Sequence, residues 1–295
     1  DPTCGSGGML VKCLDYLRAK GLPWQGVKVF GQEINALTSS IARMNLYLNG
    51  VEDFSIVCGD TLERPAFVEG SQLRKFDVVL ANPPYSIKQW DREAFMHDKW
   101  GRNFLGTPPQ GRADYAFFQH ILASMDAKTG RCAILFPHGV LFRKEEEVLR
   151  RKLVESDLIE CIIGLGANLF YNSPMEACII ICRKNKPQKA KGRITFINAV
   201  NEVVRKNAES YLEEKHIAKI CKAYSTQNNI DNFSRTVSNE LVLENSANLN
   251  ISLYVSTVAA MKISVLSVDD GIKQWQIRNK QMYNEFDNLL SLIHG

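Results

Sequence analysis

The stretch that most constrains this chain is residues 76–85, which read Phe-Asp-Val-Val-Leu-Ala-Asn-Pro-Pro-Tyr. The residues from Asp77 to Ala81 form a short, nearly continuous apolar run, which predicts a strand buried on both faces of a parallel sheet. Two consecutive prolines end this run, because each lacks an N–H group and has a fixed φ, so neither a helix nor a further ladder can follow. The chain therefore leaves the sheet at its carboxyl edge, where open α/β sheets bind ligands.

The turn after this strand presents three groups that suit a planar amine. Asn82 offers a carboxamide, and Pro83 offers a carbonyl with no competing amide at Pro84. Tyr85 adds a flat aromatic ring. Two acceptors beside such a ring can hold the N–H bonds of an adenine, cytosine or carboxamide NH2 group, which can then attack an electrophilic methyl group. The alternative is that Asn-Pro-Pro-Tyr is only a tight surface turn.

The sequence begins with a glycine-rich turn, Asp-Pro-Thr-Cys-Gly-Ser-Gly-Gly, followed by apolar residues at helical spacing over 9–17. Gly5, Gly7 and Gly8 let the backbone approach a ligand closely where a helix begins, as in nucleotide-binding turns. The turn matches neither the dinucleotide-binding pattern nor a P-loop. Asp1 would repel a pyrophosphate but suits a ligand with an amino group, such as S-adenosylmethionine.

A glycine turn of this kind normally follows a strand, and here the sequence starts at the turn itself. We therefore expect that the sequence is a fragment and that an upstream segment is present in the parent protein. The first strand of the sheet is then missing from this chain.

Acidic residues follow the next two predicted strands. The strand over 27–33 ends in Glu33, where a carboxylate can accept both ribose hydroxyls of a nucleotide. The strand over 55–62 leaves through Gly59 and places Asp60 to bond an adenine amine. Each acid alone is more often a helix cap or a solvated charge, but their shared position at successive strand ends favours a cofactor site.

The remaining segments alternate between helix and strand. Two apolar runs, 157–164 and 176–182, have no helical period between them, which predicts a hairpin. Phe170 and Tyr171 would lie at its tip beside the ligand edge, and an aromatic residue that fills the core is an equal alternative. Helices are predicted over 35–47, 113–125 and 145–156, and strands over 132–136 and 193–199. The first of these helices carries an apolar stripe of Ile34, Leu37, Ile41, Met44 and Leu48.

Three regions follow from these patterns: a catalytic domain over 1–200, a helical extension packed on it over 201–255, and a helical tail over 256–295. Segment 86–112 has no strong periodicity, and loops this long are usually functional or mobile. In the tail, apolar residues recur at alternating spacings of three and four, which predicts a heptad seam. Its members are Ile272, Trp275, Asn279, Met282, Phe286, Leu289 and Ile293. A helix folded back onto its own domain is the alternative.

Composition limits the class of protein. A chain of 295 residues with 45% hydrophobic content can bury a full core. It has neither an apolar run of about 18 residues nor a signal pattern, so we expect a cytoplasmic protein that does not enter a membrane. The eight cysteines form no Cys-x-x-Cys pair, which favours buried reduced thiols over disulfides or a metal site. The net charge of +4 permits nucleic-acid binding without showing it.

Taken together, these residues resemble the modification (M) subunit of type I restriction-modification systems, a family of N6-adenine DNA methyltransferases. The resemblance is carried by blocks that occur in the family's order between residue 1 and about residue 255. These blocks are DPTCGSGGML at 1–10, GQEIN at 31–35, GDTL at 59–62, NPPY at 82–85, ADYAFFQHIL at 113–122, FPHGVLFR at 136–143, GANLFYNSPMEACIII at 166–181 and NLNISLYV at 248–255.

The resemblance implies a Rossmann-like S-adenosylmethionine-dependent methyltransferase sheet, mostly parallel with an antiparallel hairpin, here lacking its first strand, plus a C-terminal helical region. It implies cofactor contacts from Asp1, Thr3, Gly5 and Gly7 to the methionine end, Glu33 to the ribose, and Asp60 with Thr61 to the adenine. Asn82 would border the cofactor and, with Pro83 and Pro84, form the catalytic turn that holds the target N6 amine. Tyr85 would stack on a flipped adenine, with Phe170 on the opposite side.

The resemblance also implies partners. They are double-stranded DNA with a flipped adenine, the specificity (S) and restriction (R) subunits, and a second M subunit joined through the S subunit. The family's carboxyl-terminal helix packs with helices of the S subunit, so residues 270–295 are expected to serve assembly. Two alternatives stay open: a non-catalytic truncated remnant or scaffold, and a methyltransferase that acts on protein glutamine or RNA, since these share Asn-Pro-Pro-Tyr.

Overall fold

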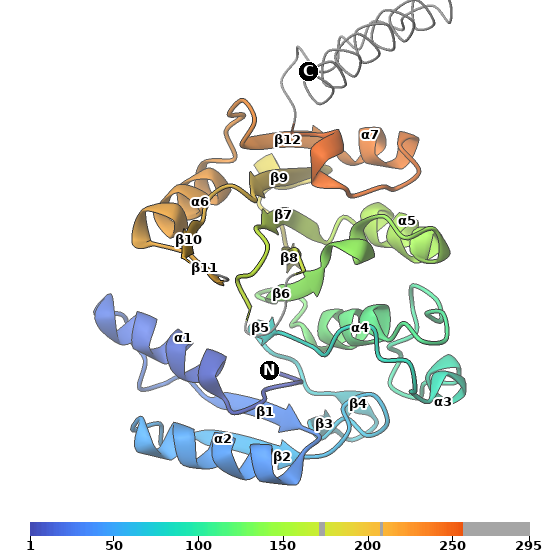
Figure 1. Cartoon of the computed structure of the whole chain (residues 1–295). Coiled ribbons are helices and arrows are strands. Elements are labelled where there is room, and N and C mark those ends of the chain that lie inside the picture. Colours follow the sequence, from blue (N-terminus) through green and yellow to red (C-terminus); the bar gives the residue numbers. More distant parts are fainter. Residues whose placement is uncertain (171–174, 207–208, 256–295) are drawn as a thin grey trace, which may run out of the picture. The chain divides into compact units, whose positions relative to one another are not determined.

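A six-stranded sheet forms the centre of the computed structural model, which describes residues 1–170, 175–206 and 209–255 (Figure 1). The strand order is β12-β9-β7-β8-β6-β5. The strands are β5 (Val78–Ala81), β6 (Arg131–Pro137), β7 (Ile159–Leu165), β8 (Ala177–Arg183), β9 (Arg193–Ala199) and β12 (Ser234–Ser238). Only β8 and β12 run against the direction of the other four. This confirms a mostly parallel sheet, and the antiparallel pairing of β7 with β8 confirms the predicted hairpin.

Two more strands lie beside this sheet without joining it. β1 (Val29–Glu33) and β2 (Phe54–Cys58) pair in parallel with each other. Among the described residues, β1 pairs with no strand but β2, and β5 pairs with no strand but β6. No strand in the described ranges therefore joins β1 to β5, and the β1 edge bonds instead to the backbone of Asp1 and Cys4. Two short hairpins complete the strands: β3 (Val68–Glu69) with β4 (Gln72–Leu73), and β10 (Val204–Lys206) with β11 (Glu209–Tyr211).

Helices cover both faces of the six-stranded sheet because its strands alternate their side chains between two apolar clusters. Ile162, Ile180 and Phe196 pack toward α4, α5 and α7, whereas Ile163 and Ile197 pack toward α6 (Figure 1). The helices are α1 (Gly8–Ala19), α2 (Ala36–Leu48), α3 (Arg92–Met96), α4 (Asp114–Ser124), α5 (Glu147–Glu155), α6 (Glu214–Thr226) and α7 (Asn239–Glu244). None of the helices in the described ranges has the length and apolar character needed to cross a membrane.

The strand before the Asn-Pro-Pro-Tyr turn is buried on one face only. Val79 and Ala81 are buried in the core, whereas Val78 is 44% exposed. Val78 and Leu80 face a cavity between β1 and β5. The prediction of burial on both faces is therefore wrong for this strand, because no described strand lies against its free edge.

The apolar stripe of α2 also differs from what an amphipathic helix usually shows. Its members Ile34, Leu37, Ile41, Met44 and Leu48 are all exposed, Leu37 to 72%. The buried face instead carries Ser39, Ala42 and Leu46. Small residues are needed there because the helix passes close to the glycine turn: a Cβ added to Gly7 would lie 3.5 Å from the Ala42 Cβ.

The sequence predicted a helical extension over 201–255, but this region also contains strands. It contains α6 and α7, but β12 pairs with β9 and forms the edge of the main sheet. The strand Ser-Arg-Thr-Val-Ser is too polar to stand out from a loop in the sequence, as is common for edge strands. The tail over 256–295, with its predicted heptad seam, and Tyr171 lie outside the described residues.

Candidate functional site

The glycine turn of residues 1–7 is tied to the end of β1. The Gly5 N–H donates to Glu33 Oε2 at 3.1 Å, and the Cys4 N–H donates to the Gln32 carbonyl at 2.9 Å. Gly5 and Gly7 have φ angles of 54° and 74°, in the left-handed region that favours glycine. Helix α1 begins directly afterwards, so its unpaired N–H groups lie at the same turn. The structure thus brings Gly5 and Glu33 into contact.

Asp1 and Thr3 complete this turn. Asp1 Oδ1 accepts the Thr3 N–H at 2.9 Å and the Thr3 hydroxyl at 3.4 Å. The Asp1 carboxylate is therefore fixed beside the glycines, where it would repel a phosphate and attract an ammonium group. A Cβ added to Gly5 would meet no atom within 4 Å. The space over Gly5 is thus open to a ligand.

Asp60 and Thr61 lie in the turn that follows β2. Asp60 Oδ1 accepts the N–H groups of Leu62 at 2.7 Å and Glu63 at 3.2 Å, which closes a local Asx-type turn. Thr61 is buried, and its hydroxyl donates to the Pro2 carbonyl at 2.5 Å. Thr61 therefore joins this turn to the glycine turn, while the half-buried Asp60 remains the member that can face a ligand.

The acceptor turn, residues 82–85, lies at the end of β5. Asn82 and Pro84 are exposed, Pro83 is buried and Tyr85 is half-buried. The Tyr85 hydroxyl donates to Asn82 Oδ1 at 3.2 Å. Burial, with the nearby Cys178 and Asp114, raises the pKa of Tyr85 to about 12, so this hydroxyl keeps its proton and remains a donor. The contact orients the Asn82 carboxamide, a role that the sequence did not indicate.

Ser86, the residue after the acceptor turn, is held by charged residues that sequence reasoning missed. Its φ of 50° is unusual for a residue other than glycine. The Ser86 N–H donates to Asp114 Oδ1 at 2.9 Å, and the fully buried Asp114 pairs with Arg143 at 2.7 Å. Arg112 also donates to the Ser86 hydroxyl at 3.3 Å. The only signal in the sequence is an acid at the start of an otherwise apolar helix.

Phe170, the predicted second wall for a stacked base, is half-buried. It packs against the apolar cluster formed by β7, β9 and α6, next to Leu169. This contact corresponds to the alternative in which a loop aromatic fills the core. The described hydrogen bonds and aromatic contacts do not join Phe170 to Tyr85, so its role toward a base stays a prediction.

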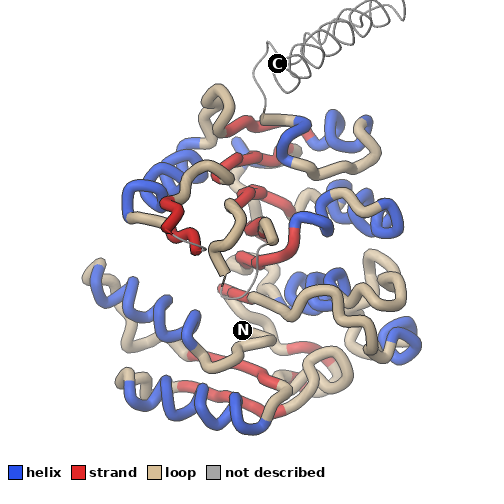
Figure 2. The backbone as a smooth tube through the Cα atoms, viewed as in Figure 1, coloured by secondary structure: helices blue, strands red, loops and turns tan. Residues whose placement is uncertain are grey.

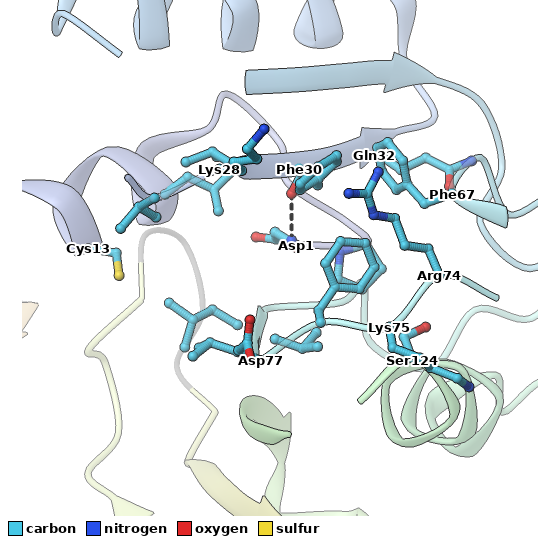
Figure 3. Close-up of a pocket in the computed structure, with 18 of the residues that line it drawn as sticks. Asp1, Cys13, Lys28, Phe30, Gln32, Phe67, Arg74, Lys75, Asp77 and Ser124 are labelled. Atoms are coloured by element: carbon cyan, nitrogen blue, oxygen red, sulfur yellow. Dashed lines mark hydrogen bonds between the residues drawn. The ribbon is translucent and has the colours of Figure 1, made fainter. Parts of the chain in front are cut away.

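A cavity of about 540 Å³ lies between β1 and β5, away from most of these residues (Figure 3). Asp1 is the only predicted site residue among its lining residues. The Asp1 nitrogen donates to the Phe30 carbonyl at 2.9 Å, and the Gln32 N–H donates to the Asp1 carbonyl at 3.0 Å. These two bonds have the pattern of one rung in a parallel ladder. Asp1 therefore occupies part of the β1 edge of this cavity, and most of the predicted site residues lie outside the cavity.

Comparison with known proteins decides the family. Residues 1–262 match the family model described as N-6 DNA Methylase. The chain belongs to the N-6 DNA methylase family. The resemblance drawn from the sequence motifs is thereby confirmed.

Relatives of this chain include methylase subunits of type I restriction enzymes. The MjaVIII methylase subunit of Methanocaldococcus jannaschii is 36% identical over 308 residues, which cover 100% of this chain and 51% of that protein. The MpnII methylase subunit of Mycoplasma pneumoniae is 30% identical over 311 residues, covering 98% of this chain and 56% of that protein. The chain therefore spans about half the length of the curated relatives it matches.

A solved structure shares the fold. The methyltransferase subunit of a type I restriction-modification system from Streptococcus thermophilus superposes with a TM-score of 0.79 at 37% identity. The match covers 87% of this chain and 53% of that protein. The chain thus shares its fold with a methyltransferase subunit of a type I restriction-modification system.

Proposed function

We propose that this chain transfers a methyl group from S-adenosylmethionine to N6 of adenine in DNA, as the modification subunit of a type I restriction-modification complex. The observation that carries the proposal is the acceptor turn, where an exposed Asn82 carboxamide is oriented by Tyr85 at the end of a parallel strand. Family membership over residues 1–262 supports the choice of adenine in DNA over the other amines that such a turn can hold.

The residues around the glycine turn fit S-adenosylmethionine. The open backbone at Gly5, the left-handed turn at Gly7 and the fixed Asp1 carboxylate, which bonds Thr3, suit the amino-acid end with its ammonium group. Glu33 suits the ribose hydroxyls, and Asp60, supported by Thr61, suits the adenine amine. When bound, S-adenosylmethionine supplies a methyl group on a positively charged sulfur, which is a good leaving group.

The acceptor turn prepares the amine. The Asn82 carboxamide oxygen and the Pro83 carbonyl accept the two N–H bonds, which draws the nitrogen lone pair out of conjugation with the ring. Tyr85 stacks on the flipped base, Pro84 keeps the turn rigid, and Phe170 is the proposed opposite wall. No base with a shifted pKa is needed, because the proton leaves only after the nitrogen has gained the methyl group. Alignment of the reacting atoms contributes most of the catalysis.

The proposed partners follow from the relatives that are named methylase subunits of type I restriction enzymes. They are double-stranded DNA, the specificity and restriction subunits, and a second methylase subunit joined through the specificity subunit. A cytoplasmic location is proposed with them, since chromosomal DNA is the substrate.

A methylation assay with an Asn82→Ala control tests the proposal. The chain is incubated with tritiated S-adenosylmethionine and unmethylated DNA, the DNA is digested, and N6-methyl-2′-deoxyadenosine is measured. We expect Asn82→Ala to lose transfer by about 100-fold or more, the scale for removing a polar group that acts on the reacting centre. Its affinity for S-adenosylhomocysteine should stay within about threefold, because Asn82 acts on the amine.

Other outcomes decide between the alternatives. Tritium found on protein glutamine or on RNA, and not on DNA, would show that the substrate is one of these molecules instead of DNA. Equal losses of cofactor affinity and transfer in Asn82→Ala would contradict the division of roles. A chain that neither binds S-adenosylhomocysteine nor transfers methyl groups would be the non-catalytic remnant or scaffold.

A further inference from the structure

Segment 86–112, between the acceptor turn and α4, contains a buried ion pair. Figure 2 shows the segment as loop interrupted by the short helix α3. The side chains of Arg102 and Asp98 are each 1% exposed and approach to 2.7 Å. Asp98 Oδ2 also accepts the N–H groups of Trp100 at 3.1 Å and Arg102 at 2.7 Å. A buried ion pair contributes little net stability, because the cost of desolvation offsets its attraction.

The other Arg102 donors reach the Asp60 turn. Nη1 donates to the Thr61 carbonyl at 2.9 Å, and Nη2 donates to the Leu62 carbonyl at 2.7 Å. The planar guanidinium therefore holds two successive carbonyls in one orientation, which a lysine cannot do. The same two residues carry the contacts of Thr61 to Pro2 and of Leu62 to the Asp60 carboxylate. Arg102 thus braces this turn through its backbone carbonyls, while the Thr61 side chain ties the turn to Pro2.

His120 on α4 also lies beside the Arg102 guanidinium. Its Nδ1 lies 3.4 Å from Arg102 Nη1, and both side chains are buried. Burial, together with the charge of Arg102, lowers the pKa of His120 to about 3. The imidazole is therefore neutral at physiological pH, so it does not repel Arg102.

The two ends of the segment are fixed to the acceptor turn. Ser86 at its start donates to Asp114, and Arg112 at its end donates back to the Ser86 hydroxyl. The middle of the segment contacts residues 61 and 62, about 40 positions earlier in the chain. One segment therefore connects the turn that follows β2 with the turn that follows β5.

We propose that Arg102 is a positioning residue for the cofactor, which orients Asp60 toward the adenine, and that segment 86–112 couples the cofactor turn to the acceptor turn. Arg102 contacts backbone carbonyls and not the reacting atoms, so its effect is on cofactor affinity and not on the chemical step. The identity of the ligand rests on the proposed function, whereas the brace itself rests on the contacts of Arg102.

Calorimetric titration tests this proposal with two ligands that share the 5′-thioadenosine part and differ in the amino-acid end. S-adenosylhomocysteine and 5′-methylthioadenosine are titrated into the chain and into Arg102→Lys, which keeps a charge for Asp98 but loses the fork. We expect both ligands to lose about tenfold or more in affinity and by the same factor, since the change acts at the adenine end. Arg92→Lys is the matched control, because Arg92 lies in the same segment but donates to the Pro108 carbonyl at 2.8 Å.

Hydrogen exchange provides a reading that needs no ligand. The Leu62 and Glu63 amides, which Asp60 caps, should exchange at least about tenfold faster in Arg102→Lys and at the normal rate in Arg92→Lys. If Arg102→Lys does not fold, Asp98→Asn is used in its place, because it removes the charge that pairs with Arg102. Normal exchange and normal affinities in the folded variant would overturn the proposal, as would a lower melting temperature with affinity intact. Faster exchange in a chain that binds neither ligand would instead leave the brace standing and refute the proposed cofactor.

Discussion

At the scale of single residues, the acceptor turn depends on a contact between its own side chains. The Tyr85 hydroxyl donates to Asn82 Oδ1, the oxygen that we propose for the target amine. A carboxamide oxygen has two lone pairs, so it can accept this bond and one from the amine together. Tyr85 therefore has two separable parts, a ring for stacking and a hydroxyl for orientation.

Replacing Tyr85 tests these parts separately. Tyr85→Phe removes one hydrogen bond in a half-buried turn, so we expect a loss of methyl transfer below about tenfold. Tyr85→Ala also removes stacking worth about 1 to 3 kcal/mol and should cost about 10- to 100-fold more. Single-turnover methylation and 2-aminopurine fluorescence at the target base measure both effects. A Phe variant as inactive as the Ala variant would assign the main role to the hydroxyl.

Glu146 makes stability depend on pH near neutrality. Burial, and to a lesser extent Asp114, raises its pKa from the usual 4.5 to about 7, although Arg143 lies 3.7 Å away and opposes the shift. Within the described ranges, neither Glu146 carboxylate oxygen has a hydrogen-bond partner. Between these two pKa values the folded state holds a proton that the unfolded state has released, so stability falls as the pH rises through this window.

Glu146→Gln should remove this dependence. Relative to the parent chain, the variant should gain up to roughly 3 kcal/mol between pH 4.5 and pH 8, since each pKa unit corresponds to about 1.4 kcal/mol. Urea unfolding at several pH values measures the difference. A constant difference between the two chains across this range would show that Glu146 titrates normally.

At the scale of elements, helix α2 shows that an apolar stripe need not face the core. Its side toward β2 carries small residues, because the helix lies close to the glycine turn, while its larger apolar side chains are exposed. Within the described residues the stripe is exposed to solvent. The packing that stabilises α2 comes from the side with Ser39, Ala42 and Leu46.

Two substitutions on this helix test which of its sides supports the fold. The sequence pattern places Leu37 on the buried side, whereas the structure places Leu46 there. Leu37→Lys should change the melting temperature by less than about 2 °C, because the side chain is already in solvent. Leu46→Ala should cost about 2 to 5 kcal/mol, because Leu46 is fully buried. Thermal and urea unfolding of the two variants measure this contrast. A large loss of stability in Leu37→Lys would show that the stripe is covered.

At the scale of the whole molecule, assembly is the part of the proposal that depends on the tail. The spacing of apolar residues over 272–293 predicts a helical seam, and these residues lie outside the described ranges. We expect the seam to pack with helices of the specificity subunit and to make no contribution to cofactor binding.

Deleting residues 270–295 tests this expectation. The shortened chain should keep its affinity for S-adenosylhomocysteine within about twofold and should no longer co-purify with the specificity subunit. Calorimetry and affinity co-purification measure the two properties. If the shortened chain still assembles, the tail belongs to the core of its own domain.

The sequence by itself determined the features that arise from neighbouring residues. The two prolines required the chain to leave the sheet after Ala81, the glycines marked the turn before α1, and uninterrupted apolar runs predicted the β7–β8 hairpin. Each of these follows from missing N–H groups, free φ angles or apolar runs of strand length, which are local properties of a few residues.

Only the tertiary structure decided which groups meet across long separations. Arg102 contacts the Thr61 carbonyl, and Asp114 holds Ser86, although no local pattern links either pair. Burial likewise depended on neighbours: Val78 is exposed in an apolar strand, whereas the side chains of Asp98 and Arg102 are enclosed in an irregular segment. The physical reason is that hydrogen bonding and solvent exclusion depend on distances in space, which are set only when the whole chain has packed.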